Sequence, residues 1–138
     1  WNRNIHTLQA GFLLAKLPYL NELNEMKRNH AFKYNKHLKD VVQHIPEEQT
    51  NRHHVYHLYS ILTNRRVELK DYLTKKNIES LIHWRIPVNE YPFLTLIDDT
   101  PIPIAKQIAE QTLTLPCHPF LSENEQDYII DSILDFYK

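Results

Sequence analysis

Apolar residues recur every three or four positions through the first third of the chain, a spacing typical of amphipathic helices. This pattern predicts one helix over residues 5–17 and a longer one over residues 19–44. Pro18 lies between them. Because proline is tolerated in the first turn of a helix, it predicts a kink or a restart rather than an end of helical structure. The first apolar stripe comprises Ile5, Leu8, Phe12, Leu13 and Leu17.

The rest of the chain contains strand patterns separated by polar and proline-rich segments. Residues 54–62 are rich in aromatic and β-branched side chains and carry apolar residues on both alternating faces, which predicts a strand with both faces partly covered. Shorter strands are predicted at residues 80–84 and 112–115. The segment 86–103 holds four prolines and predicts an irregular loop. Loops of this length in a compact domain are usually functional or mobile.

Three further helices are predicted from their end signals. Asn64 suits the N-cap of one helix, and Asn77 suits the left-handed residue that follows its end. A short helix is predicted over residues 104–110. Ser122 and Glu125 have the spacing of a capping box and predict the start of the last helix.

This order of elements predicts the α+β fold class: a small, mostly antiparallel sheet covered by helices. The 138 residues are enough for a single modest core, so we expect one domain spanning residues 1–138. No internal repeat divides the chain.

The composition excludes several function classes. The formal net charge is −1, which argues against a nucleic-acid binder, since such proteins carry a basic surface. The pairs Arg65–Arg66 and Lys75–Lys76 are isolated and make only a weak case for that role. Gly11 is the only glycine, and phosphate-binding loops of the Walker or dinucleotide kind need several.

Cysteine usage and hydropathy indicate a cytoplasmic protein without a membrane partner. Cys117 is the only cysteine, so no internal disulfide can form, which fits a reducing compartment. No run of eighteen apolar residues and no signal peptide is visible. Cys117 and His118 are not expected to form a nucleophile–base pair, because adjacent residues rarely orient each other productively.

Histidines do not show the spacing of a metal site. His30, His37 and His44 share a helix face, but positions seven apart place imidazoles about 10 Å apart along the axis. His54 and His57 would point to opposite faces of a strand. We therefore predict no metal centre. From the residue pattern alone, His83 fits a core histidine better than a ligand-binding one.

Four segments together resemble one enzyme family. Residues 103–121 fit the family pattern P-x-A-x-x-(I/L)-A … L-(S/T)-L-P-x-x-P-x-L. Residues 2–10, running on to Leu17, look like N-x-R-x-x-x-(L/I)-Q-A-A … L. Residues 54–61 look like H-x-(F/Y)-(V/H)-(I/L), and residues 81–84 look like the end of T-x-x-H-Y. In these motifs the chain resembles the DegT/DnrJ/EryC1/StrS sugar aminotransferases, which use pyridoxal 5'-phosphate to aminate keto-sugars on nucleotide carriers.

The resemblance covers nearly the whole chain but only the last third or so of such an enzyme. It implies the small C-terminal domain of a fold-type-I aminotransferase, with a three-stranded sheet. In the family the large domain carries the lysine that forms the Schiff base and the carboxylate that pairs with the pyridine nitrogen. Neither motif occurs here, so we expect no catalytic residue in this chain and no cofactor bound to it alone. The start at Trp1 also indicates a fragment.

The resemblance also implies roles for individual residues. Asn2 occupies the position of an asparagine that hydrogen-bonds the cofactor phosphate of the other subunit, which implies a homodimer. Asn4 stands where the family usually has arginine, with Arg3 beside it. Asn4 is therefore either a substrate-binding residue or merely the N-cap of the first helix. His83 and Trp84 match a strand end that faces the substrate cleft, which implies substrate binding.

The function implied for the intact protein is amination of a nucleotide-linked keto-sugar, with glutamate as the amino donor. The product would enter surface polysaccharide, lipopolysaccharide or antibiotic-sugar synthesis. Residues 87–92 depart from the family pattern, which leaves the identity of the sugar open. The alternative is a detached, non-catalytic family domain that acts as an interaction or structural module. In either case we expect the first two helices to leave an apolar face exposed.

Overall fold

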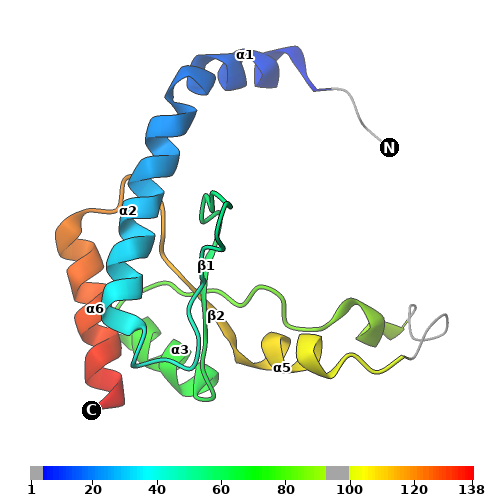
Figure 1. Cartoon of the computed structure of the whole chain (residues 1–138), viewed down its shortest axis with the longest axis vertical. Coiled ribbons are helices and arrows are strands. Elements are labelled where there is room, and N and C mark those ends of the chain that lie inside the picture. The colour runs from blue at the N-terminus through cyan, green and yellow to red at the C-terminus, as the bar shows by residue number, and fades with distance from the viewer. Residues whose placement is uncertain (1–4, 93–99) are drawn as a thin grey trace.

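The computed structural model describes residues 5–92 and 100–138 (Figure 1). Two helices joined by a short 3₁₀ turn make up most of the first third of the chain, and a small sheet with further helices follows in the described residues. In chain order the elements are α1 (Thr7–Lys16), the 3₁₀ turn η1 (Leu17–Tyr19), α2 (Leu20–Leu38), β1 (Tyr59–Leu62), α3 (Arg66–Lys75), the 3₁₀ turn η2 (Val88–Glu90), α5 (Pro103–Gln111), β2 (Thr112–Leu115) and α6 (Glu123–Tyr137).

The chain bends sharply between α1 and α2, at the position of Pro18 (Figure 1). Proline cannot donate a backbone hydrogen bond, and here it lies in the first turn of η1, where no donor is missed. The predicted restart is confirmed. The second helix is shorter than predicted, since it ends at Leu38. Backbone pairing draws the following segment to the sheet: the N–H of Leu62 donates to the carbonyl of His44 at 2.9 Å.

The sheet has two antiparallel strands in the described part of the chain, so the expected third strand is wrong. Tyr59 pairs with Leu115 and Leu62 with Thr112. The segment predicted as the third strand contributes one isolated pair, in which Leu81 exchanges two backbone hydrogen bonds with Thr114, at 2.7 and 3.1 Å. Pairing does not continue because the chain bends at His83.

The strand predicted over residues 54–62 begins only at Tyr59. Tyr56 has φ 45°, a left-handed conformation that a bulky residue rarely adopts and that interrupts an extended strand. Its backbone N–H donates to Nδ1 of His54 at 2.9 Å instead of joining a ladder. A side-chain contact therefore replaces sheet pairing over the first half of the predicted strand.

One face of the sheet packs against α2 and α6 and forms the core. Tyr34 of α2 is fully buried, and its hydroxyl donates to the carbonyl of Pro116 at 2.9 Å. Gln126 of α6 is also buried, and its amide donates to the carbonyl of His30 at 2.8 Å. These bonds satisfy polar atoms that would be costly to bury unpaired. The buried apolar residues include Ala31, Leu38, Tyr59, Ile61, Leu69, Leu73, Leu113, Leu115, Ile129, Ile130 and Ile133.

The predicted helix ends are confirmed at Ser122 and at Asn77 but not at Asn64. The capping box is confirmed: Ser122 Oγ accepts from the N–H of Glu125, whose carboxylate accepts from the N–H of Ser122. Asn77 is left-handed as expected, with φ 58°. The N-cap prediction for Asn64 is wrong. The N-cap of α3 is Arg65, and the amide oxygen of Asn64 accepts from Gln111 of α5.

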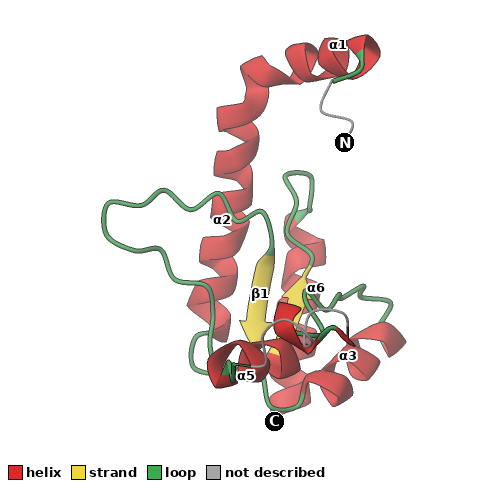
Figure 2. Ribbon diagram, turned by 90° about the vertical axis from the view of Figure 1, so that its right-hand side faces the viewer, coloured by secondary structure: helices red, strands yellow, loops and turns green. Residues whose placement is uncertain are grey.

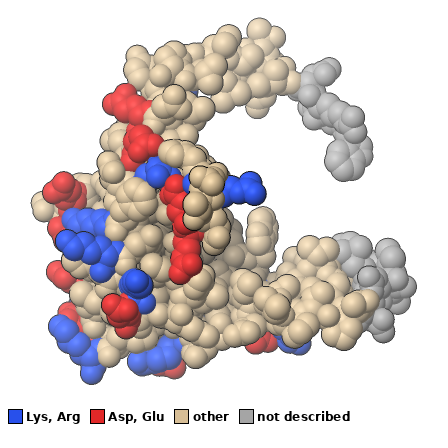
Figure 3. All heavy atoms as spheres, viewed as in Figure 1, with Lys and Arg blue, Asp and Glu red and all other residues tan. Residues whose placement is uncertain are grey.

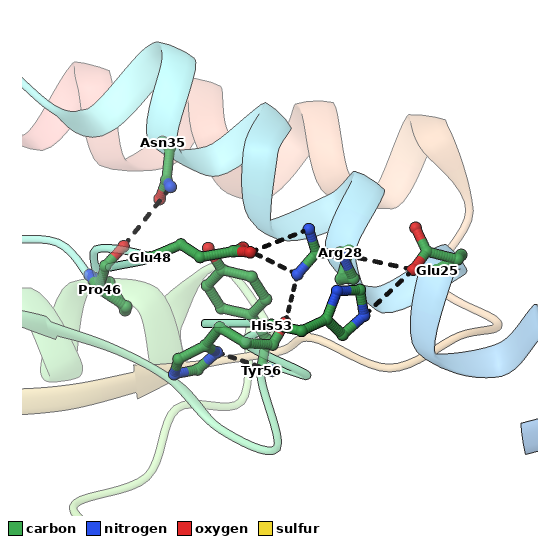
Figure 4. A network of polar contacts seen from close by, with 8 residues as sticks. Glu25, Arg28, Asn35, Pro46, Glu48, His53 and Tyr56 are labelled. Carbon is green, nitrogen blue, oxygen red and sulfur yellow. Dashed lines mark hydrogen bonds and ion pairs between the residues drawn. The ribbon is translucent and has the colours of Figure 1, made fainter. Parts of the chain in front are cut away.

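A buried arginine ties the segment after α2 back to that helix (Figure 4). Arg28 Nη1 donates to Glu48 Oε2 at 2.8 Å and to the carbonyl of His54 at 2.7 Å. Its Nε lies 3.4 Å from Glu25, which also lies 3.4 Å from Nε2 of His53. The guanidinium thus holds two points of one loop, at Glu48 and His54, against α2.

Acid is expected to weaken this contact. The hydrogen bond from Arg28, with its positive charge, holds the pKa of Glu48 below the ordinary carboxyl value. A carboxylate with a lowered folded-state pKa stabilises the fold fully above its unfolded pKa, and that stabilisation is lost as pH falls through the folded value. Glu48→Gln should therefore lower the free energy of unfolding at neutral pH, and that free energy should fall less steeply below about pH 4.5 than in the unsubstituted chain. Urea unfolding at a series of pH values measures the free energy and its pH dependence. The same substitution at the exposed neighbour, Glu47→Gln, is the control. An equally steep acid decline in Glu48→Gln would contradict the assignment.

The first helix lies apart from the core (Figure 1), and none of its residues is buried. An apolar groove runs along the inner side of the bend, lined by Leu13, Leu14, Leu17, Leu20 and Leu23 among others. On the side drawn in Figure 3, α1 shows no charged side chain. The predicted exposed apolar face is confirmed for α1. Across the described residues, no helix combines the length and apolar character needed to cross a bilayer.

Candidate functional site

The second face of the sheet is not covered by α2 and α6. Figure 3 shows the molecule hollowed between α1 and α5, and Figure 2 looks in from that side, with β1 in front of α2. Side chains alternate across a strand, so Tyr59 and Ile61 point to the core while Ser60 points to the opposite face. The same alternation places Thr114 of β2 beside it. This surface is called the open face below.

Ser60 and Thr114 form a cross-strand pair on the open face. The N–H and C=O of Thr114 bond to Leu81, so Thr114 and Ser60 are a pair without mutual backbone hydrogen bonds. Pairs of this kind bring side chains closest together. The two hydroxyl oxygens lie 2.8 Å apart. Thr114 is only 6% exposed, so its hydroxyl depends on protein partners rather than on water.

His83, in the segment that follows α3, lies next to this pair. It follows Leu81 by two positions, and Leu81 is the residue that pairs with Thr114. His83 Nδ1 lies 3.1 Å from Thr114 Oγ1. Ser60, Thr114 and His83 therefore form a continuous row of three hydrogen-bonding side chains, called here the hydroxyl–imidazole row. Nδ1 of His83 contacts the row, and Nε2 makes no hydrogen bond to any residue in 5–92 or 100–138.

Trp84 flanks the row and is largely in solvent. Its side chain is 76% exposed, and its ring lies edge-on to that of His83, with centroids 6.0 Å apart. Aromatic faces bind sugar and base rings by stacking, and an exposed tryptophan beside a half-buried histidine supplies both an apolar and a polar contact. Of the four site residues predicted from the sequence, His83 and Trp84 thus lie together.

The other two predicted site residues, Asn2 and Asn4, lie outside the described residues. The N-cap of α1 is His6, paired with Gln9 in a capping box, so the alternative in which Asn4 caps that helix is wrong. Sequence reasoning missed Ser60 and Thr114. The available signal was a hydroxyl at the polar position of each apolar strand, Ser60 in 59–62 and Thr114 in 112–115.

The residues present do not by themselves fit pyridoxal phosphate. Every lysine of the chain lies in the described residues, and none is buried. A Schiff-base lysine needs a desolvated setting that lowers the pKa of its amine. Lys27 is half-buried, and its ammonium donates to the carbonyl of His57 at 3.3 Å. The described part of this chain therefore offers no anchor for the cofactor.

Other reactive side chains have structural settings. Cys117 is half-buried, its thiol donates to the carbonyl of Lys27, and burial raises its pKa to about 11. It is therefore a neutral thiol at neutral pH, which is a poor nucleophile. No group of three metal-ligating side chains occurs in residues 5–92 and 100–138.

Comparison with known proteins places the whole chain within one group of enzymes. The model of the DegT/DnrJ/EryC1/StrS aminotransferase family matches residues 1–134. A crystal structure of a DegT DnrJ EryC1 StrS aminotransferase from Brucella abortus superposes with a TM-score of 0.92 at 33% identity, covering 97% of this chain and 36% of that one.

Two curated relatives match at similar levels. The Pleiotropic regulatory protein of Geobacillus stearothermophilus is 30% identical over 143 residues, covering 100% of this chain and 38% of that protein. The dTDP-3-amino-3,6-dideoxy-alpha-D-galactopyranose transaminase of Aneurinibacillus thermoaerophilus is 30% identical over 132 residues, covering 96% and 36%. The chain thus spans little more than a third of the length of these relatives.

Proposed function

Because the chain belongs to the DegT/DnrJ/EryC1/StrS aminotransferase family, we propose that it is the small C-terminal domain of a protein that converts a nucleotide-linked keto-sugar to an amino-sugar. The observation that carries this proposal is the family match over residues 1–134. The dTDP-amino-sugar transaminase among the relatives supports the substrate class. Surface polysaccharide or lipopolysaccharide synthesis in the cytoplasm is the setting we propose.

Substrate binding is the part that we assign to the described residues. His83 presents one ring nitrogen on the open face, and a sugar offers hydroxyl oxygens for it to bond. Trp84 offers an exposed aromatic face for ring stacking. Asn4 is retained as a proposed substrate contact on its family position alone.

Transfer of the amino group requires the cofactor and a lysine, which the described residues do not supply. Pyridoxal phosphate supplies an electron sink when bound, and its lysine anchor must come from outside the described residues. We propose glutamate as the amino donor. We also propose a homodimer, in which Asn2 of one subunit contacts the cofactor phosphate of the other.

The function is tested with the full-length protein, loaded with pyridoxal phosphate and supplied with glutamate and a panel of nucleotide-linked keto-sugars. We expect glutamate-dependent formation of an amino-sugar. His83→Gln and Trp84→Ala should each raise KM for the sugar nucleotide, while the KM for glutamate stays unchanged. A protein that binds the cofactor but aminates no member of the panel would favour the alternative of an interaction module.

Asn2→Ala in the full-length protein is expected to weaken cofactor retention by roughly ten- to a hundredfold. A hydrogen bond to a charged group contributes about 1.5–3 kcal/mol, and an alanine cannot replace the amide donor. Equilibrium dialysis against pyridoxal phosphate measures the loss without relying on turnover. Asn24→Ala on α2 serves as the matched control. Unchanged retention in Asn2→Ala would remove Asn2 from the cofactor site.

A further inference from the structure

Arg85 is an unpaired positive charge beside the candidate site. It follows Trp84 directly and lies two positions after His83, so the Cα atoms of Arg85 and His83 are within about 7 Å of each other. The side chain of Arg85 is exposed, and it makes no hydrogen bond, ion pair or ring contact with any residue in 5–92 or 100–138. Its guanidinium is therefore free to contact a ligand that lies against the ring of Trp84.

Most of the arginines that the structure describes already have a protein partner. Three of them bond to a glutamate or to a backbone carbonyl: Arg28, Arg65 and Arg66. Arg52 resembles Arg85, since it is exposed and has no side-chain partner in the described residues, but it lies in the loop that is held against α2. Arg85 is the one of these two that adjoins the aromatic and imidazole side chains of the candidate site.

Arg85 also supplies the free positive charge of its segment. It is the only lysine or arginine between Lys76 and Lys106. Lys106 of α5 lies 3.2 Å from the carboxylate of Glu90, which offsets its charge. A nucleotide-linked sugar carries negatively charged phosphate groups between its base and its sugar ring, and arginine binds phosphate through two parallel N–H bonds. Arg85 thus matches the charged part of such a ligand.

Burial decreases along residues 83–85. His83 is half-buried, and its Nδ1 lies 3.1 Å from the hydroxyl oxygen of the buried Thr114. Trp84 and Arg85 are exposed. Phosphate is costly to remove from water, so it suits the exposed end of this segment, whereas an uncharged sugar ring can hydrogen-bond at the half-buried end. The gradient gives a bound sugar nucleotide a direction.

We propose that Arg85 binds the diphosphate of the sugar nucleotide, with the sugar ring at His83 and the nucleotide extending outward past Trp84. This assignment rests on the proposed function for the identity of the sugar. The phosphate contact itself requires only a nucleoside diphosphate, so it can be measured without amination. Pyridoxal phosphate also carries a phosphate group, and the experiment below separates the two sources.

Isothermal titration calorimetry tests the contact in the full-length protein loaded with pyridoxal phosphate. The probes are dTDP, UDP and GDP, and the one that binds the unsubstituted protein most tightly is titrated into the variants. Arg85→Gln should weaken its binding by about ten- to a hundredfold, because hydrogen bonds to a charged group are lost. Arg85→Lys should recover only part of the affinity, since it keeps the charge without the two parallel bonds. Added salt should weaken binding to the unsubstituted protein more steeply than to Arg85→Gln.

Arg52→Gln is the matched control, because it removes an equally exposed and unpaired charge, and it should bind the probe as the unsubstituted protein does. Equal losses in Arg52→Gln and Arg85→Gln, or no binding of any probe, would overturn the proposal. Dialysis should show unchanged retention of pyridoxal phosphate in Arg85→Gln, and loss of the cofactor would instead place its phosphate at Arg85.

Kinetics separate this proposal from the proposed function. Arg85→Gln should raise KM for the sugar nucleotide by a factor similar to its loss of affinity, while the KM for glutamate stays unchanged. Amination with an unchanged KM for the sugar nucleotide would overturn the role of Arg85 and leave the proposed function standing. Loss of diphosphate binding in Arg85→Gln, in a protein that aminates no keto-sugar, would refute the proposed function and leave the phosphate contact standing.

Discussion

A chain of these 138 residues is expected to self-associate, and the substitutions Leu14→Lys and Leu17→Lys together are expected to abolish that association. Both leucines line the apolar groove at the bend between α1 and α2, and both are exposed. Burying such side chains contributes about 1.5–3 kcal/mol each, so the pair should weaken association by roughly two to four orders of magnitude. Lysine is a good helix former and is favourable near a helix C-terminus, so α1 should persist.

Sedimentation at rising concentration measures this effect. Val67→Lys combined with Val88→Lys is the matched control, since both valines are exposed but lie away from the groove. The control should associate as the unsubstituted chain does. In the intact protein we propose that the remaining two thirds covers this groove. A strictly monomeric unsubstituted chain would contradict the prediction and show that α1 needs no partner.

Leu113→Ala is expected to lower the free energy of unfolding by about 2–5 kcal/mol. Leu113 is fully buried in β2 opposite Ile61, where the sheet meets α2 and α6. Truncation removes apolar contacts and leaves a cavity that close-packed neighbours fill only in part. Denaturant unfolding in the double-lysine background measures the change without interference from association.

Leu8→Ala is the matched control, because it is the same substitution on α1, where the side chain is 68% exposed. It should change stability by no more than about 0.5 kcal/mol. Similar losses at both positions would show that α1 is packed as tightly as the core. A near-neutral Leu113→Ala would mean that the sheet contributes little to the core.

The parts of the fold that the sequence predicted correctly depend on neighbours within a few residues. The capping box of Ser122 and Glu125 satisfies backbone groups inside one helical turn. Pro18 acts through its own ring and its missing donor, and Asn77 through its tolerance of a left-handed backbone. The strand predicted over residues 112–115 is β2. The exposed apolar stripe of α1 followed in the same way from helical periodicity.

Two of the parts that the sequence predicted wrongly depend on partners far along the chain. The segment predicted to be a strand at residues 80–84 has strand-like composition, but only Leu81 is aligned to exchange backbone hydrogen bonds with Thr114. The helix predicted to reach residue 44 stops early because His44 pairs with Leu62. In both cases a tertiary contact outweighs a local preference, since each unpaired buried backbone group is costly.

The same distinction between local signals and long-range contacts applies to the candidate site. The family resemblance singled out His83 and Trp84, but no local pattern connects His83 to Thr114, 31 positions on, or Thr114 to Ser60, 54 positions back. Strand register creates those neighbours, and a shift of one residue would turn Thr114 to the other face. The sequence by itself determined most of the helices and strands and where several of them end. The tertiary structure alone decided which hydroxyls meet the imidazole, because cross-strand contacts are set by pairing and not by spacing along the chain.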